Sequence, residues 1–228
     1  MFSCAPLEVT VDPRLVNAQD LTVRADFGQI YIEWNPAAPP DDPQELVTLT
    51  ALDDAMESGR RVGVRPGFID VMTPGQWNFG TPLRLEVWSA EPPDDRDGWD
   101  HEVDADLDLG PGGLWIGGPP AAKRTELVAA DVPAGDYRVR ISGRGFTERG
   151  QAGADGDDSY RLRLWPRGES SPPVLRKRWP GWEPDQAAGE EVWQRPDYDA
   201  IRRSMRSQPG HRISVAPQGP PAGPPPDH

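Results

Sequence analysis

Apolar and polar residues alternate with period two along much of the first 165 residues. This pattern is typical of β-strands and restricts the chain to folds built from β-sheets. The clearest alternation occurs in four runs, at residues 83–88, 103–109, 137–141 and 160–164. Successive side chains of a strand point to opposite faces of a sheet, so each run predicts a strand with one buried and one solvated face.

Shorter runs of the same kind lie between turns that contain glycine and proline. They cover residues 21–25, 29–34, 61–64, 68–72, 114–116 and 126–129. Nine or ten short strands of this kind predict an all-β protein, namely an antiparallel β-sandwich with a jelly-roll-like arrangement.

One segment has the pattern of a helix. Asp42 offers an N-cap carboxylate, Pro43 suits the first helical position, and Glu45 follows the cap by three residues. Leucines at helical spacing continue from there to Gly59. The pattern predicts one amphipathic helix over residues 43–58, and we expect it to cap an open end of the sandwich.

Composition and charge change near residue 168. Residues 166–228 contain 19 glycines and prolines in 63 positions, whereas residues 1–165 contain 33. Residues 1–170 hold 30 acidic and 16 basic side chains, a net charge of −14, and the remaining residues hold 7 and 8. We therefore expect an acidic domain at residues 1–168 and a Pro/Trp-rich, largely irregular tail at residues 169–228.

The tail is expected to be mostly disordered or docked, with a short helix near residues 198–206. Tyr198, Ile201 and Met205 follow a possible Asp197 cap at helical spacing. The proline-rich residues 207–228 have too few apolar side chains to fold alone. Three roles remain open for the tail: it folds back on its own domain, recruits another protein, or serves as a linker.

Several features favour a cytoplasmic protein that does not enter a membrane. Cys4 is the single cysteine, which excludes an internal disulfide and a zinc site built from several thiolates. The N-terminus lacks a basic segment followed by an apolar one, and no apolar run approaches the length of a spanning helix.

Catalytic chemistry has little support in the sequence. His101 is the single histidine of the predicted domain. Its neighbour Asp100 does not indicate a catalytic pair, because adjacent side chains of a strand point to opposite faces. We therefore interpret His101 as an ordinary surface histidine. The spacing of Asp104, Asp106 and Asp108 resembles the opening of a calcium loop, but Trp115 stands where a glutamate is needed. We therefore assign no catalytic residue, no cofactor and no metal ligand.

Acidic side chains gather between residues 91 and 108. Carboxylates on a preformed sheet can steer a cationic partner. The predicted partner-binding carboxylates are Glu91, Asp94, Asp95, Asp97, Asp104, Asp106 and Asp108. We interpret the three on residues 104–108 as the solvated face of a strand. A metal-assisted hydrolase that uses this region together with His101 is the alternative from another class.

Arginines alternate along two neighbouring predicted strands. Arg138 and Arg140 share one face of the first, and Arg161 and Arg163 share a face of the second. If the two strands pair as a hairpin, the four guanidinium groups gather on one surface, where they bind an anion or form cross-strand pairs with acidic residues. Nucleic acid is a poor candidate ligand because the domain is strongly negative.

Nine tryptophans are many for this length. Five of them lie in the tail or in phase with polar faces, namely Trp88, Trp165, Trp179, Trp182 and Trp193. Exposed indoles on a sandwich could stack sugar rings, which leaves a carbohydrate-binding module as a further alternative. We favour a role of Trp179, Trp182 and Trp193 in docking the tail or a protein partner.

Some motifs resemble those of a known protein group. They are Glu91-Pro92-Pro93, Gly98-Trp99-Asp100, Pro133-Ala134-Gly135-x-Tyr137-Arg138-Val139-Arg140 and Asp158-x-Tyr160-Arg161-Leu162-x-Leu164-Trp165-Pro166. Over residues 21–166 the chain resembles uncharacterised acidic bacterial β-sandwich proteins, which are distantly similar to the competence protein J type of nuclease inhibitor. The resemblance implies a nuclease inhibitor, and it assigns no catalytic residue. Together with the domain charge of −14 and the lack of histidine and cysteine chemistry, it leads us to expect a non-catalytic acidic binding protein, an inhibitor or immunity-type protein for a basic partner such as a nuclease or toxin.

Overall fold

The computed structural model describes residues 12–34, 44–119, 127–147 and 156–182, together with residues 197, 200 and 203. The chain divides into two compact units, residues 1–193 and 194–228. In the second unit, the backbone N–H of Ala200 donates to the Asp197 carboxylate at 3.0 Å, as expected of a helix cap. The rest of the helix predicted near residues 198–206, apart from Arg203, lies outside the described residues.

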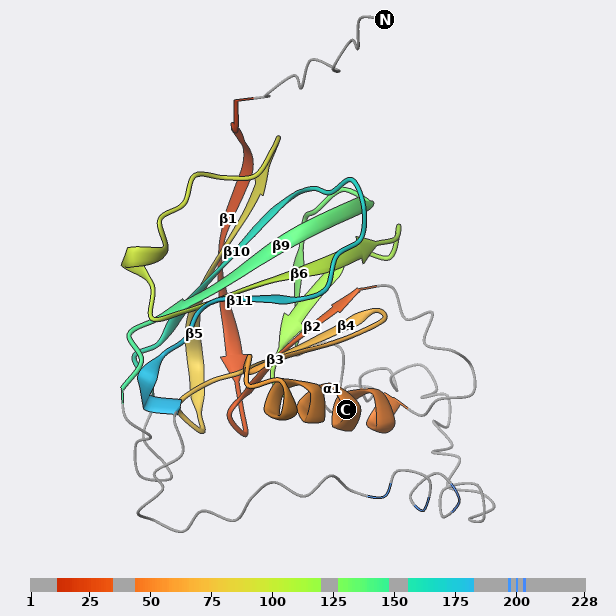
Figure 1. Ribbon diagram of the computed structural model, residues 1–228, viewed down its shortest axis with the longest axis vertical. Coiled ribbons are helices and arrows are strands. Elements are labelled where there is room, and N and C mark those ends of the chain that lie inside the picture. Colours follow the sequence, from red (N-terminus) through yellow and green to blue (C-terminus); the bar gives the residue numbers. More distant parts are fainter. Residues whose placement is uncertain are drawn as a thin grey trace, which may run out of the picture. The chain divides into compact units, whose positions relative to one another are not determined.

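The first unit contains two packed sheets, and the predicted all-β sandwich is confirmed (Figure 1). Sheet A has the spatial order β1 (Leu15–Ala25), β5 (Asn78–Trp88), β10 (Ser159–Pro166), β9 (Gly135–Arg144), β6 (His101–Leu109) and β11 (Val174–Lys177). Sheet B has the order β3 (Val62–Arg65), β4 (Phe68–Met72), β2 (Gln29–Trp34), β7 (Leu114–Gly117) and β8 (Val128–Ala130).

Sheet A departs from the predicted antiparallel pattern at one pair of strands. β10 pairs with β5 in parallel, whereas β9 pairs antiparallel with both β10 and β6. β5 and β6 therefore run in the same direction with two strands between them. The chain that leaves β5 has to cross the sheet to begin β6, and residues 89–100, which include the short 3₁₀ helix η1 (Arg96–Gly98), form this crossover.

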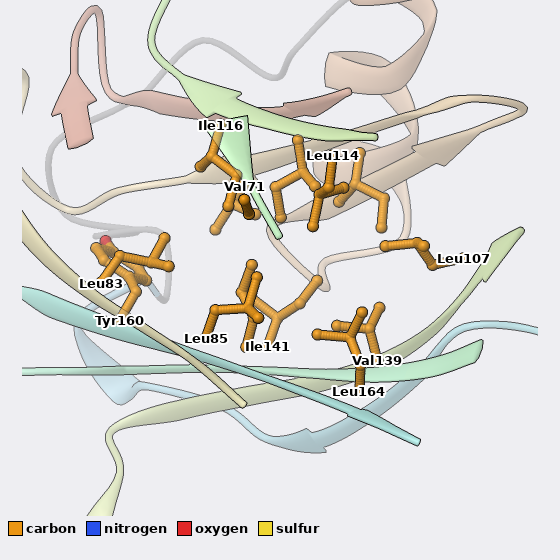
Figure 2. Packing of buried hydrophobic residues seen from close by; sticks show 14 of the residues in the cluster. Val71, Leu83, Leu85, Leu107, Leu114, Ile116, Val139, Ile141, Tyr160 and Leu164 are labelled. Atoms are coloured by element: carbon orange, nitrogen blue, oxygen red, sulfur yellow. The ribbon is translucent and has the colours of Figure 1, made fainter. Parts of the chain in front are cut away.

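The hydrophobic core lies between the two sheets. Figure 2 shows Leu85, Ile141 and Leu164 of sheet A facing Val71 and Ile116 of sheet B. All of them come from alternating positions of their strands and are buried. Each fully buried aliphatic side chain stabilises the fold by about 1.5–3 kcal/mol, so this layer is the main source of stability.

The single predicted helix forms as α1 (Gln44–Glu57), but it covers the outer face of sheet B at β3 and β4, not an open end of the sandwich (Figure 1). A Cβ atom at Gly63 of β3 would lie 1.7 Å from the carbonyl oxygen of Ala51, so only glycine allows the helix this close. Ala51 and Ala55 are completely buried. No helix within the described part of the chain is long and apolar enough to cross a membrane.

Residues that we assigned to the tail add to the sandwich. β11 pairs antiparallel with β6 and becomes the edge of sheet A. The short 3₁₀ helix η3 (Pro180–Trp182) follows and buries Trp182. In the described residues the sandwich therefore extends to residue 182, beyond the expected boundary at residue 168.

The tight turn between β1 and β2 holds an exposed phenylalanine in a left-handed conformation. Phe27 and Gly28 have φ of 50° and 73°, and Asp26 and Gln29 flank them as a bridged pair. This is the geometry of a type I′ turn, which favours Asn-Gly. We expect Phe27→Asn to raise the free energy of unfolding by about 0.5–1 kcal/mol, measured by urea denaturation.

Phe27→Ala separates turn geometry from apolar exposure. Alanine removes the exposed ring but gains nothing in the left-handed region. If Phe27→Ala stabilised the protein as much as Phe27→Asn, the turn would not be the cause.

Candidate partner-binding site

The outer face of sheet A carries rows of charged side chains that lie side by side across the strands. Register places Glu86, Arg163, Arg140 and Asp104 in one row. The next row holds Asp20, Arg84, Arg161, Ser142 and Glu102. The predicted hairpin of β9 and β10 is thus confirmed, and its arginines share one face.

The crossover lies on this face and binds the arginines beneath it. Arg140 Nη2 donates to Glu91 Oε1 at 2.8 Å. Arg161 Nη2 and Arg163 Nη2 each lie 2.7 Å from an oxygen of Asp95, and Arg163 Nη1 donates to the Pro93 carbonyl at 2.9 Å. These hydrogen bonds and ion pairs fix the crossover to the sheet.

Arg140 lies between Arg163 and Asp104 in the first row and is completely buried. Its Nε and Nη2 donate to the two carboxylate oxygens of Asp104 at 2.7 and 2.8 Å, and Glu102 Oε1 lies 3.7 Å from Nε. Burial disfavours the charge, yet the hydrogen bonds and charge of Asp104 raise the pKa of Arg140 above its ordinary value. This pair is therefore ionic and internal to the protein.

Arg138 and Arg140 form ion pairs across neighbouring strands and do not present a free cationic surface. Arg138 Nη1 donates to Asp106 at 2.7 Å, as Arg140 does to Asp104. Both pairs are direct register partners of β6 and β9. Asp104 is buried and Asp106 is only 15% exposed at its side chain. The predicted solvated face is thus wrong at Asp104 and Asp106, because arginines and residues 170–171 cover it.

The other predicted partner-binding carboxylates are exposed. The side chains of Glu91, Asp94 and Asp95 are 58%, 49% and 44% exposed, and Asp97 is exposed as well. The hydrogen bonds from Arg96 lower the pKa of Asp94 to about 2, so it is fully ionised at neutral pH. Asp108 is also exposed, at the far end of β6, and pairs with Arg167.

His101 is buried, so its interpretation as a surface histidine is wrong. The backbone N–H of Trp179 donates to Nδ1 at 3.4 Å, and Nε2 lies 2.6 Å from the Arg60 carbonyl. A carbonyl only accepts, so Nε2 carries the proton and the ring is neutral. Burial lowers the pKa of His101 to about 4. The sequence could not indicate this, because the covering residues are about 80 positions away.

Trp182 covers His101 as part of an aromatic cluster. Its ring centroid lies 4.6 Å from that of His101, 5.2 Å from Phe146 and 5.4 Å from Trp179, all in edge-on contacts. Trp182 is 4% exposed and Trp179 is half-buried. Both residues therefore hold residues 178–182 on the sandwich, while Trp193 lies outside the described residues.

Within the described residues, His101 and the carboxylates of β6 do not converge on one face. His101 shares a face of β6 with the core residue Val103, whereas Glu102 and Asp104 point to the other face. Among the described residues, no group of three or more His, Cys, Asp and Glu side chains is arranged to hold a metal ion.

Trp165, which we expected to be partly exposed, is not accessible for stacking on a sugar ring. It is 7% exposed and lies under the Arg140 guanidinium, 5.2 Å from the ring centroid. Trp88 is half-buried and donates its indole N–H to Glu86 at 3.0 Å.

Sequence reasoning missed three residues beside the crossover, Arg84, Trp99 and Arg144. Arg144 continues the alternation of Arg138 and Arg140, and Trp99 lies in the Gly98-Trp99-Asp100 motif, so both had a signal. Arg84 follows the same alternation on β5, and its Nε and Nη1 bind Glu86 and Asp20 at 2.8 Å each.

Comparison with known proteins gives distant structural matches. No family model matches the chain, and no curated protein matches it in sequence. The fold is similar to that of ComJ from Bacillus subtilis, an inhibitor of the DNA-degrading activity of NucA, with a TM-score of 0.43 and 14% identity over 69% of this chain and all of that chain. The crocagin biosynthetic gene J protein matches with a TM-score of 0.41 and 13% identity over the same shares.

Proposed function

We propose that this protein is a non-catalytic binding protein that inhibits a basic protein partner, and that the crossover is the surface that docks. The observation that supports the proposal is the pairing of exposed carboxylates with arginines beneath them. The side chains of Glu91 and Asp95 are 58% and 44% exposed, while Arg140 binds Glu91 and both Arg161 and Arg163 bind Asp95. A nuclease is the first partner to test, because it is the target that the motif resemblance implies.

Preorganised carboxylates lower the entropic cost of binding. A side chain that is already fixed loses little rotamer freedom when a partner's lysine or arginine pairs with it. The net charge of −13 adds a long-range attraction that accelerates the encounter with a cationic partner. Both effects predict fast, salt-sensitive association.

Neutralising the crossover tests the proposal. We expect the variant Glu91→Gln/Asp94→Asn/Asp97→Asn to bind its partner about tenfold more weakly, because exposed charge pairs are worth some tenths of a kcal/mol to 1 kcal/mol each. The full chain would be used to capture partners from its native cells at low and high salt. Affinity and nuclease activity of each captured protein would then be measured with both forms.

A matched control variant removes the same number of negative charges from positions outside the crossover. Asp12, Asp131 and Glu169 are exposed and lie outside the crossover. Their conversion to Asn, Asn and Gln should reduce the association rate slightly and leave the dissociation rate unchanged. Equal losses in both triple variants, or binding that does not depend on salt, would argue against the crossover as the docking surface.

A further inference from the structure

A cavity of about 360 Å³ opens on the outer face of sheet A beside the crossover. Strands β1, β5, β10 and β9 supply its lining, and Trp99 closes it at the end of the crossover. Three of the lining side chains are arginines, namely Arg84, Arg144 and Arg161. Two carboxylates, Asp20 and Glu86, line the cavity as well, so its three guanidinium groups exceed its carboxylates by one.

Arg144 is the arginine of this cavity that is available for a ligand. Its Nε donates to the Ser159 hydroxyl at 3.3 Å, and its guanidinium lies 5.0 Å from the centroid of the Trp99 ring. No carboxylate within the described residues forms an ion pair with it. Among the described side chains, its charge therefore has no paired carboxylate.

Arg161 is held against the same indole. Its guanidinium lies 4.3 Å from the Trp99 centroid, and its Nη2 donates to Asp95 at 2.7 Å. Its buried Nε has no hydrogen-bond acceptor among the described residues. Contact with the Trp99 ring orients both guanidinium groups in the lining of the cavity.

Arg84 already binds an oxyanion within the cavity. Asp20, whose side chain is 81% exposed, accepts from its Nη1 at 2.8 Å, and Glu86 accepts from its Nε. The exposed Asp20 is free to turn toward solvent when another anion arrives. The position of its carboxylate therefore marks a place where the cavity accepts negative charge.

We propose that this cavity binds a small phosphorylated molecule. The phosphate would lie between Arg144, Arg161 and Arg84, near the Ser159 hydroxyl, since guanidinium groups match phosphate oxygens in pairs. The cavity is larger than inorganic phosphate, so it has room for an organic group of about the size of a sugar. The cavity shares Trp99 with the crossover and Arg161 with its contacts, but binding of a phosphate and docking of a protein partner are measured separately, so either can fail alone.

Calorimetric titration of the full chain with ribose 5-phosphate, inorganic phosphate, ribose and citrate tests the proposal. We expect ribose 5-phosphate to bind, inorganic phosphate to bind more weakly, and ribose not to bind. Absence of binding by both phosphates at millimolar concentration would overturn the proposal. Tighter binding of citrate than of either phosphate would assign the cavity to carboxylates instead and overturn it as well.

Two substitutions with opposite expected effects locate the ligand. Arg144→Gln should weaken the binding of ribose 5-phosphate about tenfold, because one charged hydrogen-bond donor is lost. Asp20→Asn should strengthen it severalfold by removing the competing carboxylate. Arg24→Gln is the control, because Arg24 is a partly exposed arginine of β1 that pairs with Asp26 outside the cavity, and it should leave the affinity unchanged. An unchanged affinity in Arg144→Gln, or equal losses in the variants of Arg144 and Arg24, would exclude this cavity.

Discussion

Replacing Arg140 with glutamine is expected to lower the free energy of unfolding by about 4 kcal/mol. The guanidinium is completely buried and compensates the buried carboxylates of Asp104 and Glu102. Glutamine removes the positive charge and leaves these carboxylates in a medium of low polarity. Urea denaturation at neutral pH, followed by circular dichroism, measures the change.

A second substitution identifies the source of the loss. In Arg140→Gln/Asp104→Asn the buried negative charge is reduced together with the positive one, so we expect part of the stability to return. Arg144→Gln is the matched control, since Arg144 is exposed and pairs with no described carboxylate, and its effect should stay within about 0.5 kcal/mol. A double variant no more stable than Arg140→Gln would mean that lost packing, not unpaired charge, destabilises the protein.

Replacing Asp70 with asparagine is expected to stabilise the protein by about 4 kcal/mol at pH 7. Asp70 is completely buried on β4, on the face of sheet B that α1 covers, with Gly63 and Tyr31 as its register neighbours. Neither carboxylate oxygen has a hydrogen-bond partner among the described residues. Burial consequently raises the pKa of Asp70 to about 8.

The sign of the effect follows from the two protonation states. In the unfolded chain Asp70 ionises near its ordinary pKa of 3.8, whereas the folded protein keeps it neutral up to about pH 8. Its contribution to stability is fully present below pH 3.8 and declines as the pH rises toward 8. Asparagine does not ionise, so the difference between Asp70→Asn and the natural protein should vanish near pH 3.5 and grow up to pH 8.

Unfolding curves of both proteins across this pH range provide the measurement. The lowered pKa of His101 makes the stability of both proteins rise with pH between about 4 and 6.5. Subtracting one free energy of unfolding from the other removes this contribution, because both proteins contain His101. Asp136→Asn, at an exposed site of β9, should show no such growing difference. A constant gain of stability at all pH values would show that folding does not raise the pKa of Asp70 and that another property of asparagine is responsible.

Alternation along the sequence determined the strands and one of their pairings. The clearest runs become β5, β6, β9 and β10, and β9 pairs with β10 as the predicted hairpin. These features are predictable because each strand places every second residue on one face. The charge on each face is then a property of the sequence alone. The register of β9 with β6, which joins Arg138 to Asp106 and Arg140 to Asp104, was decided by the fold.

The coverage of those faces was decided by the tertiary structure. Alternation predicts a solvated face for Asp104 and Asp106, but it cannot show that arginines and residues 170–171 will cover them. His101 likewise owes its burial to Trp179 and Trp182, which no local pattern connects with β6. Contacts between distant segments depend on the path of the connections. Because β5 and β10 pair in parallel, the connection from β5 to β6 crosses the outer face of sheet A.

The same division applies to the candidate site and to α1. From the sequence we could name the carboxylates of Glu91, Asp94, Asp95 and Asp97, because local composition marks them. Only the fold decided that arginines of β9 and β10 hold Glu91 and Asp95 from below, and that α1 covers Asp70 and not an end of the sandwich. Strand periodicity is a local property, whereas burial is set by whichever distant segment packs on a face.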